Sequence, residues 1–357
     1  LYEINDTFND SLVFSEKPTY IETTKDSTST FEFSNLKEGN YLLLALKEEN
    51  NNYTFQPIND KIGFAKSIVS LPTDSSYVLT LFKEVPEYKI DRPKHRSKHS
   101  ISFGYQGDIT DLTIDLVSDV PENFESRIIM DRKTDSLFFW FKPEIKADSI
   151  VFVAKNKSKI DTLYLRIRDL YKDSLEIAPL NAGFLIPNDT LKIKSNTPLV
   201  SFDAEKIRIL NVDSVLVKAD LSLNQKYNVA NIIFPRTEDN VYKVRLLPGA
   251  LIDYFEKSND TLDFRVMTKG VSDYGTLSLT LENSNEFPIL VQLVNEKFIV
   301  VSEFHLIENA PVFFDHISPG NFYLRIVYDE NGNKKWDTGN FLNRLSPEKI
   351  IYYPSKI

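Results

Sequence analysis

Hydrophobic and polar residues alternate one by one along much of this chain. In the stretch TLSLTL, Leu277, Leu279 and Leu281 fall on one side of an extended backbone, and TLYLRIRDL repeats the pattern from Leu163 to Ile167. Such runs are short and are bounded by Asn, Asp, Ser, Gly and Pro, which is typical of antiparallel strands with one solvated face. The pattern therefore predicts an all-β chain.

One run differs because it is apolar on both faces. The stretch LFFWFKP, from Leu137 to Pro143, has no polar alternation, which predicts a central strand covered on both sides. We find no amphipathic helix longer than a turn or two. Many short strands, each with one apolar and one polar face, predict tandem Ig-like or transthyretin-like β-sandwiches.

Three breaks in the pattern divide the chain into four parts. They are EVPEYKIDRPKHRSKHS after about residue 85, IAPLNAGFLIPND near 180 and VMTKGVSDYG near 270. We predict a transthyretin-like sandwich at 1–85 that is N-terminally incomplete, a β-sandwich at 86–180, a bacterial Ig-like domain at 181–269, and a transthyretin-like sandwich at 270–357 that repeats the first.

An internal repeat connects the first and last parts. Residues 31–56 align without a gap to 312–337, and the matched pairs include Phe33 with Phe314, Gly39–Asn40 with Gly320–Asn321, Tyr41 with Phe322, and Phe55 with Trp336. The shared unit predicts a strand, a Gly-Asn hairpin turn with positive φ, a second strand, and a polar loop closed by an aromatic plug. Fewer residues precede the first copy, so we expect its domain to lack strands.

The polar loop of the second copy has the spacing of a calcium loop. Its candidate ligands occupy positions 1, 3, 5, 7 and 9, and are Asp329, Asn331, Asn333, the carbonyl of Lys335, and Asp337. Ca²⁺ takes six to eight oxygen ligands, but position 12 holds Phe341 in place of a bidentate Glu. The alternative is an Asx-rich turn that satisfies its own backbone. Any bound Ca²⁺ would be structural and would do no chemistry.

Composition narrows the function classes. The 357 residues carry a formal net charge of −9, which argues against nucleic acid as a partner. The chain has no Cys and four His, and none of these His has a zincin motif or an i,i+4 partner on a helix. Motifs for a serine nucleophile, a phosphate loop or a dinucleotide are absent from the sequence. We therefore predict a protein that is not an enzyme.

Three segments carry a resemblance to known families. SNTPLVSFDAEKIRILNVDSV followed by YKVRLLPGALIDYFEKSNDTLDFRVMT looks like bacterial Ig-like domains of the surface-layer type. FEFSNLKEGNY with NDKIGFA resembles carboxypeptidase-regulatory or transthyretin-like modules. The ending DENGNKKWDTGNFLNRLSPEKIIYYP resembles the C-terminus of large Ig-like-domain lipoproteins of the Bacteroidota outer membrane. The resemblance covers nearly the whole chain and is weakest at 86–180.

The resemblance implies a location and a way of working. It implies a signal peptide and a lipidated Cys upstream of Leu1, so that the protein sits on the extracellular face of the outer membrane and meets the membrane only through that anchor. We expect a non-catalytic scaffold or accessory subunit of an outer-membrane β-barrel complex, in barrel assembly or secretion, with the barrel protein and other surface lipoproteins as partners. The alternative is a carbohydrate-binding or adhesive cell-surface module.

Overall fold

The computed structural model describes residues 1–24, 28–186, 189–282 and 286–357. Regular structure in these residues is almost entirely β, and the helical segments are three short 3₁₀ turns, η1 (Asp10–Phe14), η2 (Ala204–Lys206) and η3 (Val271–Asp273). The predicted all-β class is confirmed. Among the described residues, no helix has the length and apolarity that crossing a membrane requires.

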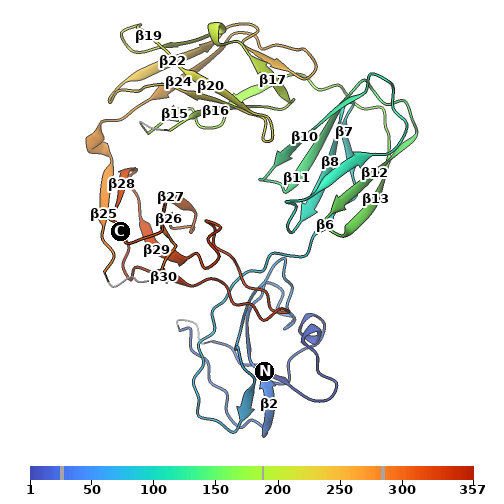
Figure 1. Cartoon of the computed structure of the whole chain (residues 1–357), viewed down its shortest axis with the longest axis vertical. Helices are drawn as coiled ribbons and strands as arrows, with labels where there is room; N and C mark the ends of the chain where they lie inside the picture. Colours follow the sequence, from blue (N-terminus) through green and yellow to red (C-terminus); the bar gives the residue numbers. More distant parts are fainter. Residues whose placement is uncertain (25–27, 187–188, 283–285) are drawn as a thin grey trace. The chain divides into compact units, whose positions relative to one another are not determined.

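The chain forms two compact units. The first contains Leu1–Pro86, Ser278–Phe313 and Gly320–Ile357, and the second contains Glu87–Leu277 and Phe314–Pro319. Figure 1 shows that the strands gather in separate blocks that follow one another along the chain. The four-domain division stays a prediction, and each unit is described by itself below.

The second unit begins with a sandwich of two sheets. One sheet has the order β10-β11-β8-β6 with β7 also on β8, and the other has the order β13-β12-β9. Their bounds are β6 (Lys89–Ile90), β7 (Lys94–Ser97), β8 (Ser100–Gln106), β9 (Thr113–Leu116), β10 (Glu125–Asp131), β11 (Ser136–Lys142), β12 (Ser149–Asn156) and β13 (Lys159–Arg166).

Aromatic rings fill the space between these sheets. Phe152 of β12 packs edge-on against Phe103 at 5.0 Å and Phe139 at 5.2 Å between ring centroids. The doubly apolar stretch is β11, which lies between β10 and β8 as predicted. The predicted break EVPEYKIDRPKHRSKHS contains two short strands, β6 (Lys89–Ile90) and β7 (Lys94–Ser97), which both pair with β8.

The rest of the second unit is a larger sandwich. Its sheets have the orders β14-β16-β21-β20 and β15-β24-β22-β18-β19, with the pair β17-β23 beside them. Their bounds are β14 (Ile177–Pro179), β15 (Gly183–Phe184), β16 (Leu191–Ser195), β17 (Leu199–Phe202), β18 (Ile207–Leu210), β19 (Leu216–Val217), β20 (Asp220–Asn224), β21 (Val229–Ile233), β22 (Val241–Leu246), β23 (Leu251–Asp253) and β24 (Leu262–Met267).

The first unit combines segments from both ends of the chain. Its N-terminal strands form the sheets β1-β2-β5 and β3-β4, and its C-terminal strands form the sheet β27-β26-β29-β30. Their bounds are β1 (Tyr2–Glu3), β2 (Gly39–Leu42), β3 (Leu44–Lys47), β4 (Lys61–Phe64), β5 (Val69–Leu71), β26 (Ile289–Asn295), β27 (Val300–Leu306), β29 (Phe322–Tyr328) and β30 (Ile350–Tyr352). Strands β25 (Gly275–Leu279) and β28 (Val312–Ile317) form a further two-stranded sheet, and the division into units falls within both strands.

The repeat unit differs from the predicted hairpin. Strand β28 pairs with β25, whereas β29 pairs with β26 and β30, so the Gly320–Asn321 turn joins two different sheets. Positive φ was predicted at the Gly-Asn turn, and Gly39 (φ 156°) adopts it, whereas Asn40, Gly320 and Asn321 do not. The aligned residues Asn35 (φ 58°) and His316 (φ 55°), which precede the turn, adopt positive φ in both copies. A left-handed residue ahead of the turn redirects the chain out of its sheet, which a tight hairpin does not require.

Candidate functional site

The five predicted metal ligands lie together in one hydrogen-bonded loop after β29. Asp329 is fully buried, and its carboxylate accepts the backbone N–H of Asn333 at 3.0 Å and of Lys334 at 2.9 Å. The side-chain oxygen of Asn331 accepts the N–H of Asn333 at 3.0 Å, and the side-chain oxygen of Asn333 accepts the N–H of Lys335 at 2.8 Å. These are Asx turns, so the loop satisfies its own backbone.

Asp337 closes the same loop through side-chain amides. Its Oδ2 accepts Nδ2–H of Asn331 at 2.5 Å and Nδ2–H of Asn333 at 2.6 Å. A hard cation bound to these Asn residues needs their amide oxygens, which here accept backbone N–H groups instead. Among the described residues, no group of three or more His, Cys, Asp or Glu lies close enough to hold a metal ion. Calcium at this loop therefore stays a prediction.

Glu348 also belongs to the hydrogen-bonded loop, although the sequence analysis did not identify it. This residue is 8% exposed, and its carboxylate accepts the N–H of Glu330 at 2.8 Å and of Asp337 at 2.9 Å. Burial raises the pKa of the Glu348 carboxyl above its usual value, and the negative charges of Asp337 and Asp329 add to that rise, while the two backbone N–H groups oppose it. It lies 11 residues beyond Asp337, so calcium-loop spacing could not reveal it.

The N-terminal copy has the same network. Glu48 accepts the N–H of Asn52 at 3.2 Å and of Tyr53 at 2.9 Å, as Asp329 does in the second copy. Asp60 accepts the N–H of Glu49 at 3.3 Å and of Gln56 at 2.8 Å, and so takes the place of Glu348. Positive φ recurs at the aligned pairs Asn51 with Gly332 and Tyr53 with Lys334. The repeat thus specifies a loop geometry as well as a sequence pattern.

The predicted aromatic plug, a ring buried in the core at the end of the loop, is present in only one of the two copies. Phe55 is 1% exposed in the N-terminal core, but Trp336 is 36% exposed. The indole N–H of Trp336 donates to the carbonyl oxygen of Glu348 at 3.1 Å, which holds the ring at the loop surface. A residue further along the chain enters the same N-terminal core as Phe55.

That residue is Phe341, which enters the core of the N-terminal sheets. It is fully buried beside Phe64, at 5.7 Å between ring centroids, and Phe14, at 6.4 Å. Its backbone N–H donates to the carboxylate of Glu84, and Arg344 pairs with Asp10 at 2.6 Å. We call this set of contacts the clasp, because it joins the last segment of the chain to the first domain within one unit.

We expect the clasp to weaken as pH rises through the range in which Glu84 ionises. Burial raises the pKa of the Glu84 carboxyl, against the opposing effect of the Phe341 N–H. A pKa raised in the folded state contributes stability that is present below the unfolded value of about 4.3 and is lost as pH rises through the folded value. Glu84→Gln should remove this dependence, which melting temperatures of both proteins between pH 4 and pH 7 would measure.

The same experiment distinguishes two roles of Glu84. If the burial of Glu84 dominates, the melting temperature of Glu84→Gln should rise relative to that of the wild type as pH increases. If Glu84→Gln is instead less stable by an equal amount at every pH, the carboxylate acts chiefly as the acceptor for Phe341, and the expected pH dependence is wrong.

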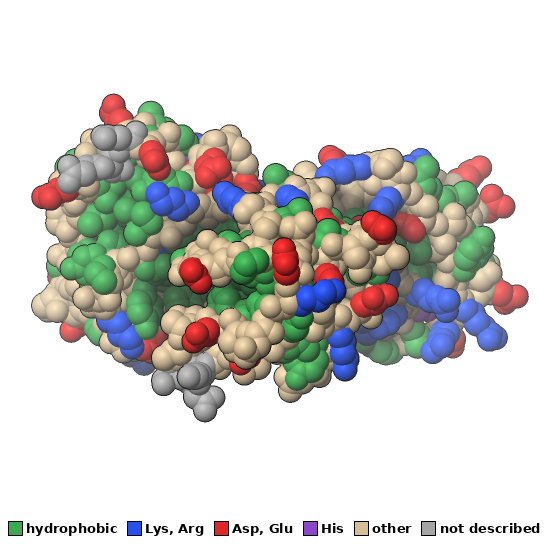
Figure 2. Space-filling view, turned by 90° about the horizontal axis from the view of Figure 1, so that it is seen from below, with side chains coloured by type: hydrophobic (Ala, Val, Ile, Leu, Met, Phe, Trp, Pro, Cys, Tyr) green, Lys and Arg blue, Asp and Glu red, His purple; other side chains and the backbone are tan. Residues whose placement is uncertain are grey.

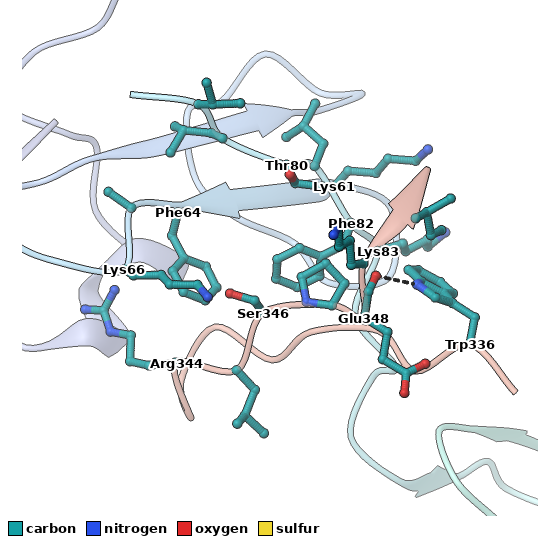
Figure 3. A pocket seen from close by; sticks show the side chains of 18 of the residues that line it. Lys61, Phe64, Lys66, Thr80, Phe82, Lys83, Trp336, Arg344, Ser346 and Glu348 are labelled. Atoms are coloured by element: carbon teal, nitrogen blue, oxygen red, sulfur yellow. Dashed lines mark hydrogen bonds between the residues drawn. The ribbon is translucent and has the colours of Figure 1, made fainter. Parts of the chain in front are cut away.

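A groove of about 1420 Å³ lies beside the clasp, wholly inside the first unit. Figure 3 shows its two walls: Lys61, Phe64, Lys66, Thr80, Phe82 and Lys83 come from the first domain, and Trp336, Arg344, Ser346 and Glu348 from the last segment. Small-molecule pockets have volumes of about 300–1,000 Å³, so this groove is large enough for a length of chain.

One stretch of the groove wall is extended but unpaired. Residues 77–80 alternate in exposure, as in an extended chain, with Tyr77 and Leu79 packed against the core while Val78 is 96% exposed. Phe82 exchanges backbone hydrogen bonds with Ile62, but the N–H groups of 77–81 donate to no group among the described residues. An extended backbone with free N–H groups is an open edge to which another strand can add.

The C-terminal sheet carries a row of hydrogen-bonded polar side chains that extends to the groove. Gln292 of β26 donates to Glu303 of β27 and accepts from Arg325 of β29 at 2.6 Å, and Arg325 donates to Tyr352 of β30 at 3.2 Å. The row crosses the sheet because these residues are direct cross-strand partners. Arg325 and Tyr352 also line the groove.

Three aromatic rings flank this row. Phe298 stacks on Tyr323 at 5.5 Å with an interplanar angle of 12°, and meets Tyr352 edge-on at 6.0 Å. Phe298 is 53% exposed although large and apolar. An exposed ring cluster beside polar groups offers a surface for ligands that have an apolar face and hydroxyl groups.

Comparisons with known proteins found similarity among solved structures only. No protein-family model matches the chain, and no curated protein matches it. The chain is similar to the I9–I11 tandem from titin (10% identity, 68% of this chain and 95% of that chain, TM-score 0.18). It is also similar to the four N-terminal Ig domains of Dscam1 isoform 7.44 (12%, 69% and 76%, TM-score 0.21) and to the S-layer protein rSbsC (12%, 93% and 49%, TM-score 0.23).

Proposed function

We propose that this chain is a non-catalytic surface module that binds an extended segment of a partner protein in the groove of its first unit. The observation that carries the proposal is the unpaired extended stretch 77–81, which lines the groove with free backbone N–H groups. Strand addition at such an edge gives affinity through main-chain hydrogen bonds, and neighbouring pockets give specificity.

The fuller form of the proposal names the setting. We propose an outer-membrane lipoprotein on the extracellular face, anchored by an upstream lipid, that serves as an accessory subunit of a β-barrel complex in barrel assembly or secretion. The resemblance of the ending DENGNKKWDTGNFLNRLSPEKIIYYP supports this setting. A barrel protein is a suitable partner because its strands are extended segments that pair by main-chain hydrogen bonds.

Photo-crosslinking in intact cells tests the proposal. A benzophenone side chain placed at Val78, which is 96% exposed in the groove wall, should link the protein to a barrel partner. The same group at Tyr164, which is 71% exposed on β13 in the other unit, is the control and should not. Recovery of the protein alone from both positions, with no partner after purification from native membranes, would contradict the proposal.

The second candidate is a carbohydrate-binding or adhesive module. The stacked Phe298 and Tyr323 beside the Gln292–Arg325 pair favour it, because sugars bind to aromatic faces flanked by polar groups. A glycan array decides between the two functions. Binding that Phe298→Ala abolishes would support a sugar site, and an array without signal would remove this candidate.

We also keep the proposal that Ca²⁺ binds weakly at the loop of Asp329, Asn331, Asn333, Lys335 and Asp337 and stiffens it. Extracellular Ca²⁺ sites have dissociation constants near 1 mM, so about 5 mM Ca²⁺ should add about 1 kcal/mol to the free energy of unfolding. The measurement is the melting temperature with Ca²⁺ and with EDTA. A rise that Asp337→Asn abolishes supports a bound ion, whereas equal temperatures identify the loop as an Asx turn alone.

A further inference from the structure

The lining of the groove is basic although the chain is acidic. Seven Lys and Arg side chains line it against two Glu, in a protein with a formal net charge of −9. Because the chain as a whole is acidic, this excess of positive charge is local to the groove. The face drawn in Figure 2 carries both acidic and basic side chains. A local excess of one sign is a feature that a charged ligand can recognise.

Four of these cations have no carboxylate partner. Lys61, Lys66, Lys83 and Lys297 are exposed and form no ion pair within the described part of the chain. The two acidic side chains of the lining do not balance the positive charge of these lysines. Both carboxylate oxygens of Glu348 accept backbone N–H groups of its own loop, and Glu330 is exposed and contributes a single negative charge.

Two of the lysines lie opposite each other on neighbouring extended segments. Ile62 and Phe82 are bridge partners in an antiparallel register, which places Lys61 across from Lys83 one residue further along. Like charges directly opposite each other across strands are destabilising. An anion bound between them would relieve that repulsion, which gives this end of the groove a preference for negative charge.

We propose that the groove takes an acidic extended peptide segment, with a carboxylate at every second residue, added beside 77–81. This inference rests on the proposed function and names the chemistry of its partner. Alternate residues of an added strand lie about 6.8 Å apart on one face, so successive carboxylates follow the edge while the free N–H groups of 77–81 bind the main chain.

Those free N–H groups favour a peptide over an acidic polysaccharide. A polysaccharide can meet the lysines, but it has no regular series of carbonyl acceptors to pair with an extended backbone. The unpaired stretch and the unpaired lysines line the same groove, and an acidic strand would satisfy both.

Fluorescence anisotropy with the full chain tests the proposal. The probes are three labelled heptapeptides of alternating Val with Glu, Ser or Lys, together with an alginate oligosaccharide. The Glu peptide should bind about tenfold more tightly than the Ser peptide, since each exposed ion pair adds only a modest increment. Raising NaCl from about 50 to about 300 mM should reduce that ratio, because salt screens exposed charges.

Charge reversal in the groove has a matched control. Lys61→Glu with Lys83→Glu should abolish the preference for Glu over Ser and create one for the Lys peptide. Lys155→Glu with Lys192→Glu changes two exposed strand lysines of the second unit, which also form no ion pair among the described residues, and should leave the preference unchanged.

The possible outcomes distinguish a failure of the charge preference from a failure of the proposed peptide-binding function. If Glu, Ser and Lys peptides bind equally, the charge preference is wrong while peptide binding stands. If no peptide binds and the Val78 crosslink is also absent, the proposed function fails and the inference fails with it. Tighter binding of alginate than of the Glu peptide, lost on charge reversal, would overturn the peptide in favour of a polysaccharide.

Discussion

Replacing Phe341 by Ala should destabilise the first domain by about 3–5 kcal/mol, the usual cost of emptying a buried phenylalanine position. The side chain is fully buried and packs on Phe14 and Phe64. Its removal leaves a cavity in a core of only eight buried residues, of which it is one. Native-state hydrogen exchange at Ile62 and Phe82, which donate to each other's carbonyl oxygens, measures the loss locally.

The neighbouring residue provides the control for this prediction. Leu342 is 48% exposed, so Leu342→Ala should change stability by no more than about 0.5 kcal/mol. Equal exchange in Phe341→Ala and Leu342→Ala would mean that the N-terminal core does not depend on the last segment. Local exchange is the better measure because a chain of several domains need not unfold in one step.

The clasp shows a limit of pattern-based prediction. Alternation at 277–281 and 163–167 correctly predicted which residues face inward, because that information lies within each strand. Phe341 stands in a polar loop with no periodic neighbours, and its partner Glu84 is 257 residues away in the sequence. Local pattern cannot specify which domain receives a single buried residue.

The repeat was informative about the loops and misleading about the turn. It correctly paired Glu48 with Asp329 as equivalent positions, and both accept two backbone N–H groups at the same offsets. It suggested a hairpin because Gly-Asn usually forms one, whereas here the turn joins separate sheets. Turn chemistry restricts the local backbone, but strand pairing is decided by contacts from elsewhere in the chain.

The groove could not have been predicted from the sequence. Its four lysines without an ion pair among the described residues are Lys61, Lys66, Lys83 and Lys297, and in the sequence each resembles an ordinary solvated charge. Their significance arises because the two ends of the chain share one unit. The unpaired stretch 77–81 is equally inconspicuous, since a strand sequence does not show whether its backbone has a partner.

Replacing Asp329 by Ala should cost about 2 kcal/mol of unfolding free energy, the second large effect that we expect. The N–H of Lys334 loses its acceptor, whereas the N–H of Asn333 keeps its bond to the side-chain oxygen of Asn331 at 3.0 Å. The fully buried position that held the carboxylate is emptied as well. A donor left unsatisfied away from water costs about 1–3 kcal/mol. Asp329→Asn keeps one acceptor oxygen and should recover about half of the loss. Hydrogen exchange in β29 and β30, measured in EDTA, reports the change.

The N-terminal copy supplies the matched comparison for Asp329. Glu48 makes the same two bonds but is only half-buried, so water can replace them after Glu48→Ala and the cost should fall to about 1 kcal/mol. Equal costs at the two positions would show that burial does not set the effect. A cost at Asp329 that appears only when Ca²⁺ is added would assign the loop's stability to a bound ion, because the Asx hydrogen bonds are present with or without it.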